Sequence, residues 1–237
     1  MVGYNEVKKY CKENNLTLVG YVKMILNIKI DKRRNSIKEK IRRRVIDNPN
    51  RKRLENKDAT IVSINCNGCT ISHDLGMRFN SQFVNLWLYP EDFLKYCENF
   101  DYYNSLPLNF VKEEGIDYPV GILEDIRIYF MHYLSEEEAR EKWESRKKRI
   151  DKENIFFMMT DQEGCTPEQM KRFDNLPYKN KVIFTHLPLK DIKSSYYIKG
   201  FEKEESVGKL NSWTGRYSIK KFYDRFDYVE WLNNGRK

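Results

Sequence analysis

The chain has 237 residues, of which 40% are hydrophobic, 14% aromatic and 33% charged, and it carries a formal net charge of +8. This length is enough to bury a substantial core in one domain, or in one domain with an appendage. The apolar and aromatic content excludes an intrinsically disordered chain, and the positive charge suggests an acidic partner or an acidic surface.

Positive charge is concentrated near the N-terminus. Residues 23–53 hold thirteen Lys and Arg residues against three acids, Asp31, Glu39 and Asp47. That segment therefore carries +10, and the rest of the chain carries −2. This contrast divides the chain into a basic N-terminal extension, residues 1–53, and a main domain, residues 54–237.

The cysteines and the hydropathy of the chain bear on its location. Only Cys66 and Cys69 of the five cysteines are closely spaced, which favours a reducing cytoplasm over a disulfide framework. The apolar run at 16–30 contains Lys23 and precedes no cleavage site, so it reads neither as a membrane-spanning helix nor as a signal peptide. We expect a cytoplasmic protein, with a peripheral position at the inner face of the membrane as a further possibility.

The basic extension contains conflicting local signals. Residues 22–30 alternate as a strand does, but Ile25 breaks the alternation, so strand and helix both stay open. Ser36 and Glu39 have the spacing of a capping box and predict a helix that begins at Ser36. The sequence Asp-Asn-Pro-Asn at 47–50 predicts the end of this helix.

From residue 58 onward, short apolar runs alternate with helical patterns. Pro90, the capping box of Ser135 and Glu138, and the Thr166-Pro167 pair each predict the start of a helix. The apolar runs predict strands buried on both faces, at 59–64, 83–88, 126–130, 155–160 and 181–185, with a weaker one at 118–123. The alternation predicts an α/β fold with a mainly parallel open sheet flanked by helices in three layers.

The stretch SINCNGCTISHDLG, residues 63–76, concentrates reactive side chains directly after an apolar run. Cys66, Cys69 and His73 have part of a zinc spacing, but no second close pair of ligands follows. A redox pair would need Cys66 at the start of a helix, and TISHDLG is a poor helix opening. A packed, inert Cys66 is the more plausible interpretation, and we predict no metal site here.

Several titratable side chains follow apolar runs. Asp161 comes after 155–160, His132 after 126–130 and His186 after 181–185, while His73 lies in the loop after 59–64. Because ligands of open α/β sheets bind beyond the carboxyl ends of the strands, we predict one shared cleft for these groups. The alternative for Asp161 is that Asp-Gln-Glu-Gly forms a turn, and this alternative is slightly favoured.

Other groups of residues give weaker evidence for a functional site. Arg146 and Arg149 are three residues apart on a predicted helix and could clamp a phosphate, although a solvated basic face is the simpler interpretation. Ser81, His73 and Asp74 could in principle form a hydrolase triad, but no GxSxG elbow is present. Neither a P-loop nor a dinucleotide fingerprint occurs, and no cofactor is identified.

The segments 64–88, 118–133, 139–150, 155–164 and 176–185 together resemble the DUF1919 family, whose members are usually labelled exopolysaccharide or capsular polysaccharide biosynthesis proteins. The resemblance covers about residues 36–235 and implies an α/β fold and a role in bacterial surface glycans. Two departures are Cys69, where the family usually has Gly, and Gln82, where it often has Pro. The positions that match its pattern are Asn65, Cys66, Gly68, His73, Asn80, Ser81, His132, Tyr133, Trp143, Arg146, Arg149 and Asp161.

Two functions of different classes follow from the residues and the resemblance. The first is a glycosyltransferase-like or other sugar-modifying transferase that binds a sugar donor or a glycan intermediate. Its predicted catalytic residues are His73, His132 and Asp161, and its predicted ligand-binding residues are Asn65, Asn80, Ser81, Trp143, Arg146, Arg149 and His186. The second is a non-catalytic module whose basic extension binds anionic lipid or glycan intermediates. Nucleic acid is a less favoured partner, because the main domain is close to neutral.

Overall fold

A four-stranded parallel sheet forms the centre of the chain, for which a computed structural model describes residues 4–235. Its strands run in the order β1 (Thr60–Ser63), β5 (Ile155–Thr160), β6 (Lys181–Thr185) and β7 (Ser195–Tyr197). Every neighbouring pair is parallel, with Thr60 opposite Ile155 and Phe157 opposite Lys181. The prediction of an α/β fold with a mainly parallel sheet is confirmed.

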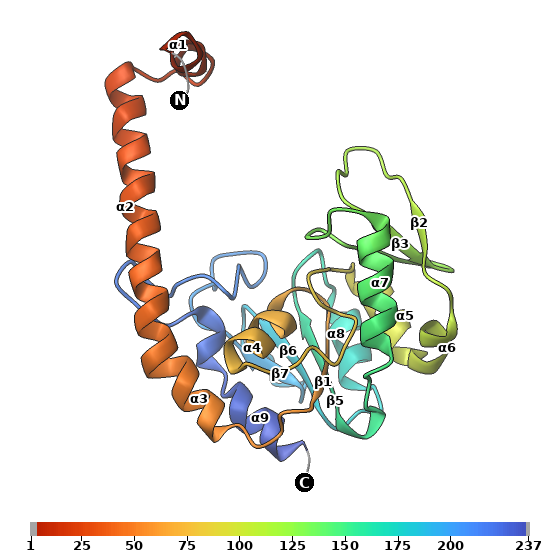
Figure 1. Cartoon of the computed structure of the whole chain (residues 1–237). Helices are drawn as coiled ribbons and strands as arrows, with labels where there is room; N and C mark the ends of the chain where they lie inside the picture. The colour runs from red at the N-terminus through yellow and green to blue at the C-terminus, as the bar shows by residue number, and fades with distance from the viewer. Residues whose placement is uncertain (1–3, 236–237) are drawn as a thin grey trace.

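Helices cover both faces of this sheet (Figure 1). One core contains Phe157 and Met159 of β5, and the other contains Phe156 and Met158, because successive strand side chains point to opposite faces. The first face is covered by α5 (Pro90–Glu98), α7 (Glu136–Lys147) and α8 (Pro167–Asp174). The second is covered by α4 (Asn67–Leu75) and α9 (Tyr228–Asn234). The result is three layers, as predicted.

A small antiparallel sheet lies outside the parallel one. It consists of β2 (Asn109–Val111), β3 (Val120–Leu123) and β4 (Ile126–Tyr129), with β3 in the middle. The predicted strands at 118–123 and 126–130 therefore exist, but they pair with each other and not with the parallel sheet. They form a hairpin because only two residues, Glu124 and Asp125, separate them, and Glu124 has the positive φ that such turns need.

The predicted strand at 83–88 is wrong. This segment is a loop, and Trp87 within it forms an isolated bridge with Tyr129. Phe83, Leu86 and Leu88 are nevertheless buried in the first core. An apolar run therefore marked burial correctly here, but burial was achieved by packing beneath helices and not by strand pairing.

The helices predicted from start signals in the main domain are present. Ser135 caps α7 by accepting from the Glu138 amide, and Thr166 forms a full capping box with Gln169 at the start of α8. Helix α5 begins at Pro90, as expected for proline in the first turn. The remaining short helices are α6 (Phe100–Ser105) and the 3₁₀ turns Lys152–Asn154 and Phe222–Arg225.

The N-terminal extension is helical throughout its described part. Helix α1 (Tyr4–Glu13) is followed by the long α2 (Leu18–Arg42), a π-helical turn (Arg43–Asp47) and α3 (Asn48–Arg53). Residues 22–30 are thus helix. The predicted helix start at Ser36 is wrong, since Ser36 lies inside α2, and Asn48-Pro49 does not end the helix but opens α3. Proline is tolerated there because the first turn needs no amide hydrogen bond from it.

A buried cluster of charges fixes the C-terminal part of α2 to the main domain. The guanidinium of Arg42 is fully buried and contacts Asp47, Asp74 and Asp224. The Tyr223 hydroxyl donates to Asp74 and accepts from Arg42. The distal part of α2, together with α1, projects away from the main domain (Figure 1). The proposed domain boundary at residue 53 stays a prediction.

Candidate functional site

A cavity of about 550 Å³ opens where β1 and β5 end. This is the edge at which open α/β sheets bind ligands, because loops diverge there and helices begin. Its walls come from the segments after β1 and β5, from the loop that precedes α5, from the turn after β4, and from a C-terminal loop. The lining residues are Ile64, Asn65, Cys66, Asn67, Trp87, Leu88, Met131, His132, Thr160, Gln162, Glu163, Gly208, Lys209, Leu210 and Asn211.

A chain of amide and hydroxyl groups forms one wall of the cavity. Asn65 Nδ2 donates to Thr160 Oγ1 at 3.2 Å and to Gln162 Oε1 at 3.0 Å. Gln162 Nε2 donates to the Gly208 carbonyl at 3.4 Å. Asn65 Oδ1 accepts from the Asn67 amide at 3.1 Å, which ties the end of β1 to the first turn of α4. These side chains are held in defined positions while still facing the cavity.

Trp87 supplies an aromatic wall. Its ring stacks on Tyr129, with centroids 4.1 Å apart and planes inclined by 12°. The backbones of the two residues also pair in both directions, at 3.0 Å and 2.9 Å. Because the ring is fixed by both contacts and is only half-buried, it offers a rigid apolar surface to a ligand.

An imidazole and an ammonium group border the opening of the cavity. His132 follows β4 and is exposed, and Lys209 is exposed on the C-terminal loop. An imidazole can take up or release a proton near neutral pH, and an ammonium group can offset the charge of an anionic ligand. The cavity therefore combines hydrogen-bonding groups, an aromatic wall, a proton acceptor and a cation.

Asp161 and His186 lie at the same edge but form a separate unit. Asp161 Oδ2 accepts from the His186 amide at 2.7 Å and from His186 Nδ1 at 2.6 Å, and its Oδ1 accepts from the Val207 amide at 2.7 Å. Both oxygens of this buried carboxylate thus join the loops after β5, after β6 and before Gly208. Asp161 and His186 border a second cavity of about 620 Å³. The expected turn at 161–164 is present, with positive φ at Glu163 and Gly164.

The Cys66–Cys69 pair lies at the start of a helix, so the expectation of a poor helix opening was wrong. Cys66 is the N-terminal cap of α4. A hydrogen bond to Cys69, together with burial, raises the pKa of the Cys66 thiol. The same hydrogen bond lowers the pKa of Cys69 to about 7, against the opposing effect of burial. Cys66 therefore stays protonated at neutral pH. Cys69 is the thiol with the lowered pKa, and its side chain is buried.

Gly68 explains how α4 reaches this position. A Cβ atom at Gly68 would lie 2.7 Å from Ser63 Cβ and 2.9 Å from Ile61 Cγ2. Only glycine therefore allows the first turn of α4 to pack directly on β1. The Gly68 amide also donates to Ser63 Oγ at 3.3 Å.

His73 does not join the other predicted residues. It lies in the last turn of α4, whose first turn borders the cavity, and its side chain is 73% exposed. The helix carries it away from the strand ends, and it lines neither of the two cavities described above. Neither of these cavities contains His73 together with Asp161, and a shared role of the two residues stays a prediction.

The remaining predicted residues support the loop between α4 and α5. Asn80 Nδ2 donates to the Asp58 carbonyl at 3.1 Å, and Ser81 Oγ accepts from the Phe83 amide at 3.1 Å. Trp143 is buried in the first core. Their ligand-binding roles stay predictions.

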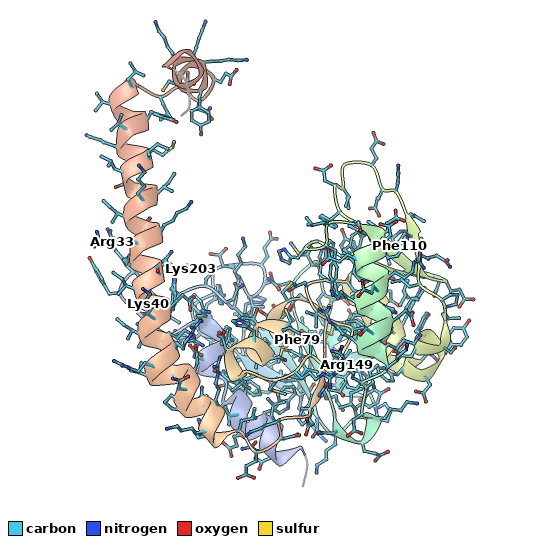
Figure 2. The ribbon with its side chains drawn as sticks, in the orientation of Figure 1. Arg33, Lys40, Phe79, Phe110, Arg149 and Lys203 are labelled. Atoms are coloured by element: carbon cyan, nitrogen blue, oxygen red, sulfur yellow. The ribbon has the colours of Figure 1, made fainter. Side chains whose placement is uncertain are left out.

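Arg146 of α7 and Arg149, just beyond the end of this helix, both contact the loop between α4 and α5. Arg149 donates to the Phe79 carbonyl at 3.1 Å, and Figure 2 shows these two residues side by side. Arg146 donates to the Tyr133 hydroxyl at 2.6 Å and lies over the Phe79 ring. Neither arginine lines the cavity at the ends of β1 and β5, and the predicted phosphate clamp stays a prediction.

Asn65 and His132 were predicted site residues and line the cavity, whereas Trp87, Gln162, Lys209 and Asn211 line it without having been predicted. Within residues 4–235, no group of three or more His, Cys, Asp and Glu side chains is arranged to hold a metal ion. Over the same residues, no helix combines the length and the apolar character needed to cross a membrane.

The chain is similar in sequence to a protein family and to a bacterial protein. The sequence model of DUF1919, described as a domain of unknown function, matches residues 37–233. An uncharacterized protein of Haemophilus influenzae is 52% identical over 183 residues, which cover 77% of this chain and 88% of that protein. The match contains the parallel sheet and the cavity but neither α1 nor the distal part of α2. The chain therefore belongs to the DUF1919 family.

Proposed function

We propose that the chain is a sugar-modifying transferase of bacterial surface-glycan assembly, and that the cavity at the ends of β1 and β5 binds an activated sugar donor. The observation that carries the proposal is the combination of Asn65, Gln162 and Trp87 around one opening. Amide side chains exchange hydrogen bonds with sugar hydroxyls in both directions. An aromatic ring packs against the apolar face of a sugar ring.

The size and position of the cavity also support this function. A volume of about 550 Å³ is within the range of small-molecule sites in proteins. Lys209 at the rim would offset the negative charge of a phosphate-linked donor. The likeness to proteins labelled exopolysaccharide or capsular polysaccharide biosynthesis proteins agrees with a sugar as the ligand.

In the proposed reaction, a hydroxyl oxygen of the acceptor forms a bond to the anomeric carbon of the donor sugar. The bond between that carbon and the donor phosphate oxygen breaks, and its electron pair leaves with the phosphate. His132 accepts the proton of the attacking hydroxyl. Lys209 stabilises the charge that develops on the phosphate, while Asn65, Gln162 and Trp87 hold the sugar.

A ligand panel tests the proposal. Nucleoside diphosphate sugars, free nucleoside diphosphates and free sugars are added to the purified chain, and the melting temperature is followed, since a ligand that binds only the native state stabilises it. We expect a rise with one or more nucleoside diphosphate sugars. The Asn65→Ala and Trp87→Ala variants should bind that donor at least about tenfold more weakly.

Asn50→Ala is the matched control, because Asn50 is a half-buried asparagine of α3 that hydrogen-bonds to Tyr228 and lies outside the cavity. It should bind the donor as the wild type does. The proposal is wrong if no activated sugar stabilises the chain, or if the cavity variants bind as tightly as Asn50→Ala.

A further inference from the structure

The outward side of α2 exposes a row of large apolar side chains. Val19, Val22, Leu26 and Ile30 follow one another at spacings of three and four residues, and Ile37 and Ile41 continue the row beyond Arg33. Residues at these spacings lie on one face of a helix. Each of the six apolar side chains is between 45% and 65% exposed, so the described parts of the chain leave this row uncovered.

The row lies beside the face of α2 that contacts the main domain, and not on that face. Lys38 and Arg42 are buried, and Lys38 donates to the carbonyls of Gly215 and Arg216 at 3.1 Å and 3.3 Å. Ile37 and Ile41 each precede one of these residues and are therefore turned about 100° from the contact side. The main domain lies to one side of α2 (Figure 1), and the side chains of the row stay exposed.

Positive charges flank the row on both sides. Lys23 and Lys29 accompany its distal half, and both are exposed. Arg33 and Lys40, which are also exposed, accompany its proximal half (Figure 2). The only two acids of α2 are otherwise engaged. Asp31 pairs with Arg34 at 2.8 Å, and Glu39 pairs with Lys221 of the main domain at 3.4 Å.

We propose that this outward face of α2, residues 19–41, docks on the surface of an anionic phospholipid bilayer. An apolar strip with Lys and Arg along its edges suits that surface, because the apolar side chains enter the boundary of the acyl chains and the cations remain among the headgroups. The docking requires nothing of the cavity and is independent of the proposed transferase activity.

The charge pattern selects this occupant over a second copy of the chain. Two α2 helices pairing through the same face would bring Lys23, Lys29, Arg33 and Lys40 of one copy against the cations of the other, with no acid on the shared face. A helix pair of this kind normally carries opposite charges beside its apolar seam. An anionic bilayer supplies the missing negative charge.

The test is flotation of the full chain with vesicles of phosphatidylcholine alone and of phosphatidylcholine with phosphatidylglycerol, at low and at high salt. We expect binding to the anionic vesicles only, with the bound fraction falling at high salt because salt screens the attraction. Leu26→Glu and the double variant Arg33→Glu/Lys40→Glu should each weaken binding at least about tenfold.

Leu134→Glu is the matched control for Leu26→Glu, since Leu134 is 96% exposed and lies outside α2. Lys112→Glu is the control for the charge changes. All the changed positions are exposed, so melting temperatures should stay near that of the wild type. Equal binding to neutral vesicles, or equal binding of Leu26→Glu and Leu134→Glu, would overturn the proposal. The proposal would also be overturned if the chain does not bind vesicles but forms a dimer that the Leu26→Glu substitution dissociates.

Discussion

Two clusters of polar side chains in the described part of the chain differ in one respect. The groups of the first cluster pair with one another, whereas those of the second also face open space. Around Arg42, three carboxylates and the Tyr223 hydroxyl enclose one guanidinium completely. Around the cavity at the ends of β1 and β5, Asn65 and Gln162 are fixed by one another, yet they line about 550 Å³ of open space. The first arrangement pairs its groups within the fold, and the second leaves groups facing open space, where we propose that a ligand binds.

This difference distinguishes polar groups that hold the fold together from polar groups that are left free to bind a ligand. A buried charge must be matched by nearby partners, because its transfer out of water is costly. Groups that bind a ligand must instead be held in place by part of their hydrogen-bonding capacity while the rest faces the solvent. Substitutions in the Arg42 cluster should therefore change mainly stability, and substitutions in the cavity should change mainly ligand binding.

The largest effect on stability is expected for Arg42→Met. It leaves Asp47, Asp74 and Asp224 without their buried counter-charge, and breaking such a pair typically costs about 3 to 5 kcal/mol. Urea denaturation measures the change. Arg53→Met is the control, because Arg53 pairs with Asp227 on the surface and exposed pairs contribute about 1 kcal/mol or less. Equal losses in the two variants would show that the cluster does not stabilise the fold.

The same cluster predicts a dependence of stability on pH. Burial alone would raise the pKa of Asp74, but the hydrogen bond from Tyr223 and the charge of Lys221 outweigh it and lower the pKa below its ordinary value. Asp74 therefore stabilises the native state above its unfolded-state pKa of about 4, and this contribution disappears as the pH falls through the lowered native value. Asp74→Asn should cost about 1.5 to 3 kcal/mol at neutral pH.

That difference between Asp74→Asn and the wild type should narrow as the pH falls below ~4, because the carboxylate is then protonated first in the unfolded state and, below its lowered native pKa, in the native state as well. Denaturation curves of both proteins at neutral and acidic pH measure it. A difference that stays constant across this range would mean that the charge of Asp74 does not contribute.

A smaller loss is expected for Gly68→Ala, which places a Cβ within 2.9 Å of both Ser63 and Ile61. Such overpacking usually costs about 1 to 3 kcal/mol, and the shift of α4 should also weaken ligand binding in the cavity. Gly215→Ala is the control, since the nearest atom to its Cβ would be 3.9 Å away. Thermal melting of both variants provides the measurement, and an unchanged Gly68→Ala protein would contradict the described packing.

The smallest effect on stability is expected in the cavity itself. Asn65→Ala removes hydrogen bonds to Thr160 and Gln162, each of which contributes about 1 kcal/mol at most because the site is open to water. Its ligand affinity should nevertheless fall sharply. A variant that unfolds like Arg42→Met would place Asn65 among the structural residues.

The fold was predictable where local signals and tertiary packing agree. The runs at 59–64, 155–160 and 181–185 are strands because β-branched and aromatic residues suit a sheet buried on both faces. The run at 83–88 is also apolar apart from Asn85, but it packs beneath helices and forms a loop. Ser36 and Glu39 carry a capping pattern inside α2, where the preceding turn is already helical and leaves no amide to cap.

The candidate site was predictable only in part, for a related reason. Asn65 and His132 follow apolar runs directly, so the rule for strand ends locates them. Lys209 and Asn211 come from a loop far along the chain, and Trp87 belongs to a run misread as a strand. The spacing of Arg146 and Arg149 was visible, but their partner, the Phe79 segment, depends on how the loop before α5 folds back over α7.

The most direct test of the account is a crystal structure of the chain with a nucleoside diphosphate sugar that raises its melting temperature. We predict the sugar between Trp87 and Gln162, with the diphosphate directed to Lys209 and the anomeric carbon within reach of His132. A donor bound instead in the second cavity beside His186, with the space in front of Asn65 empty, would contradict the assignment of function to the cavity at the ends of β1 and β5.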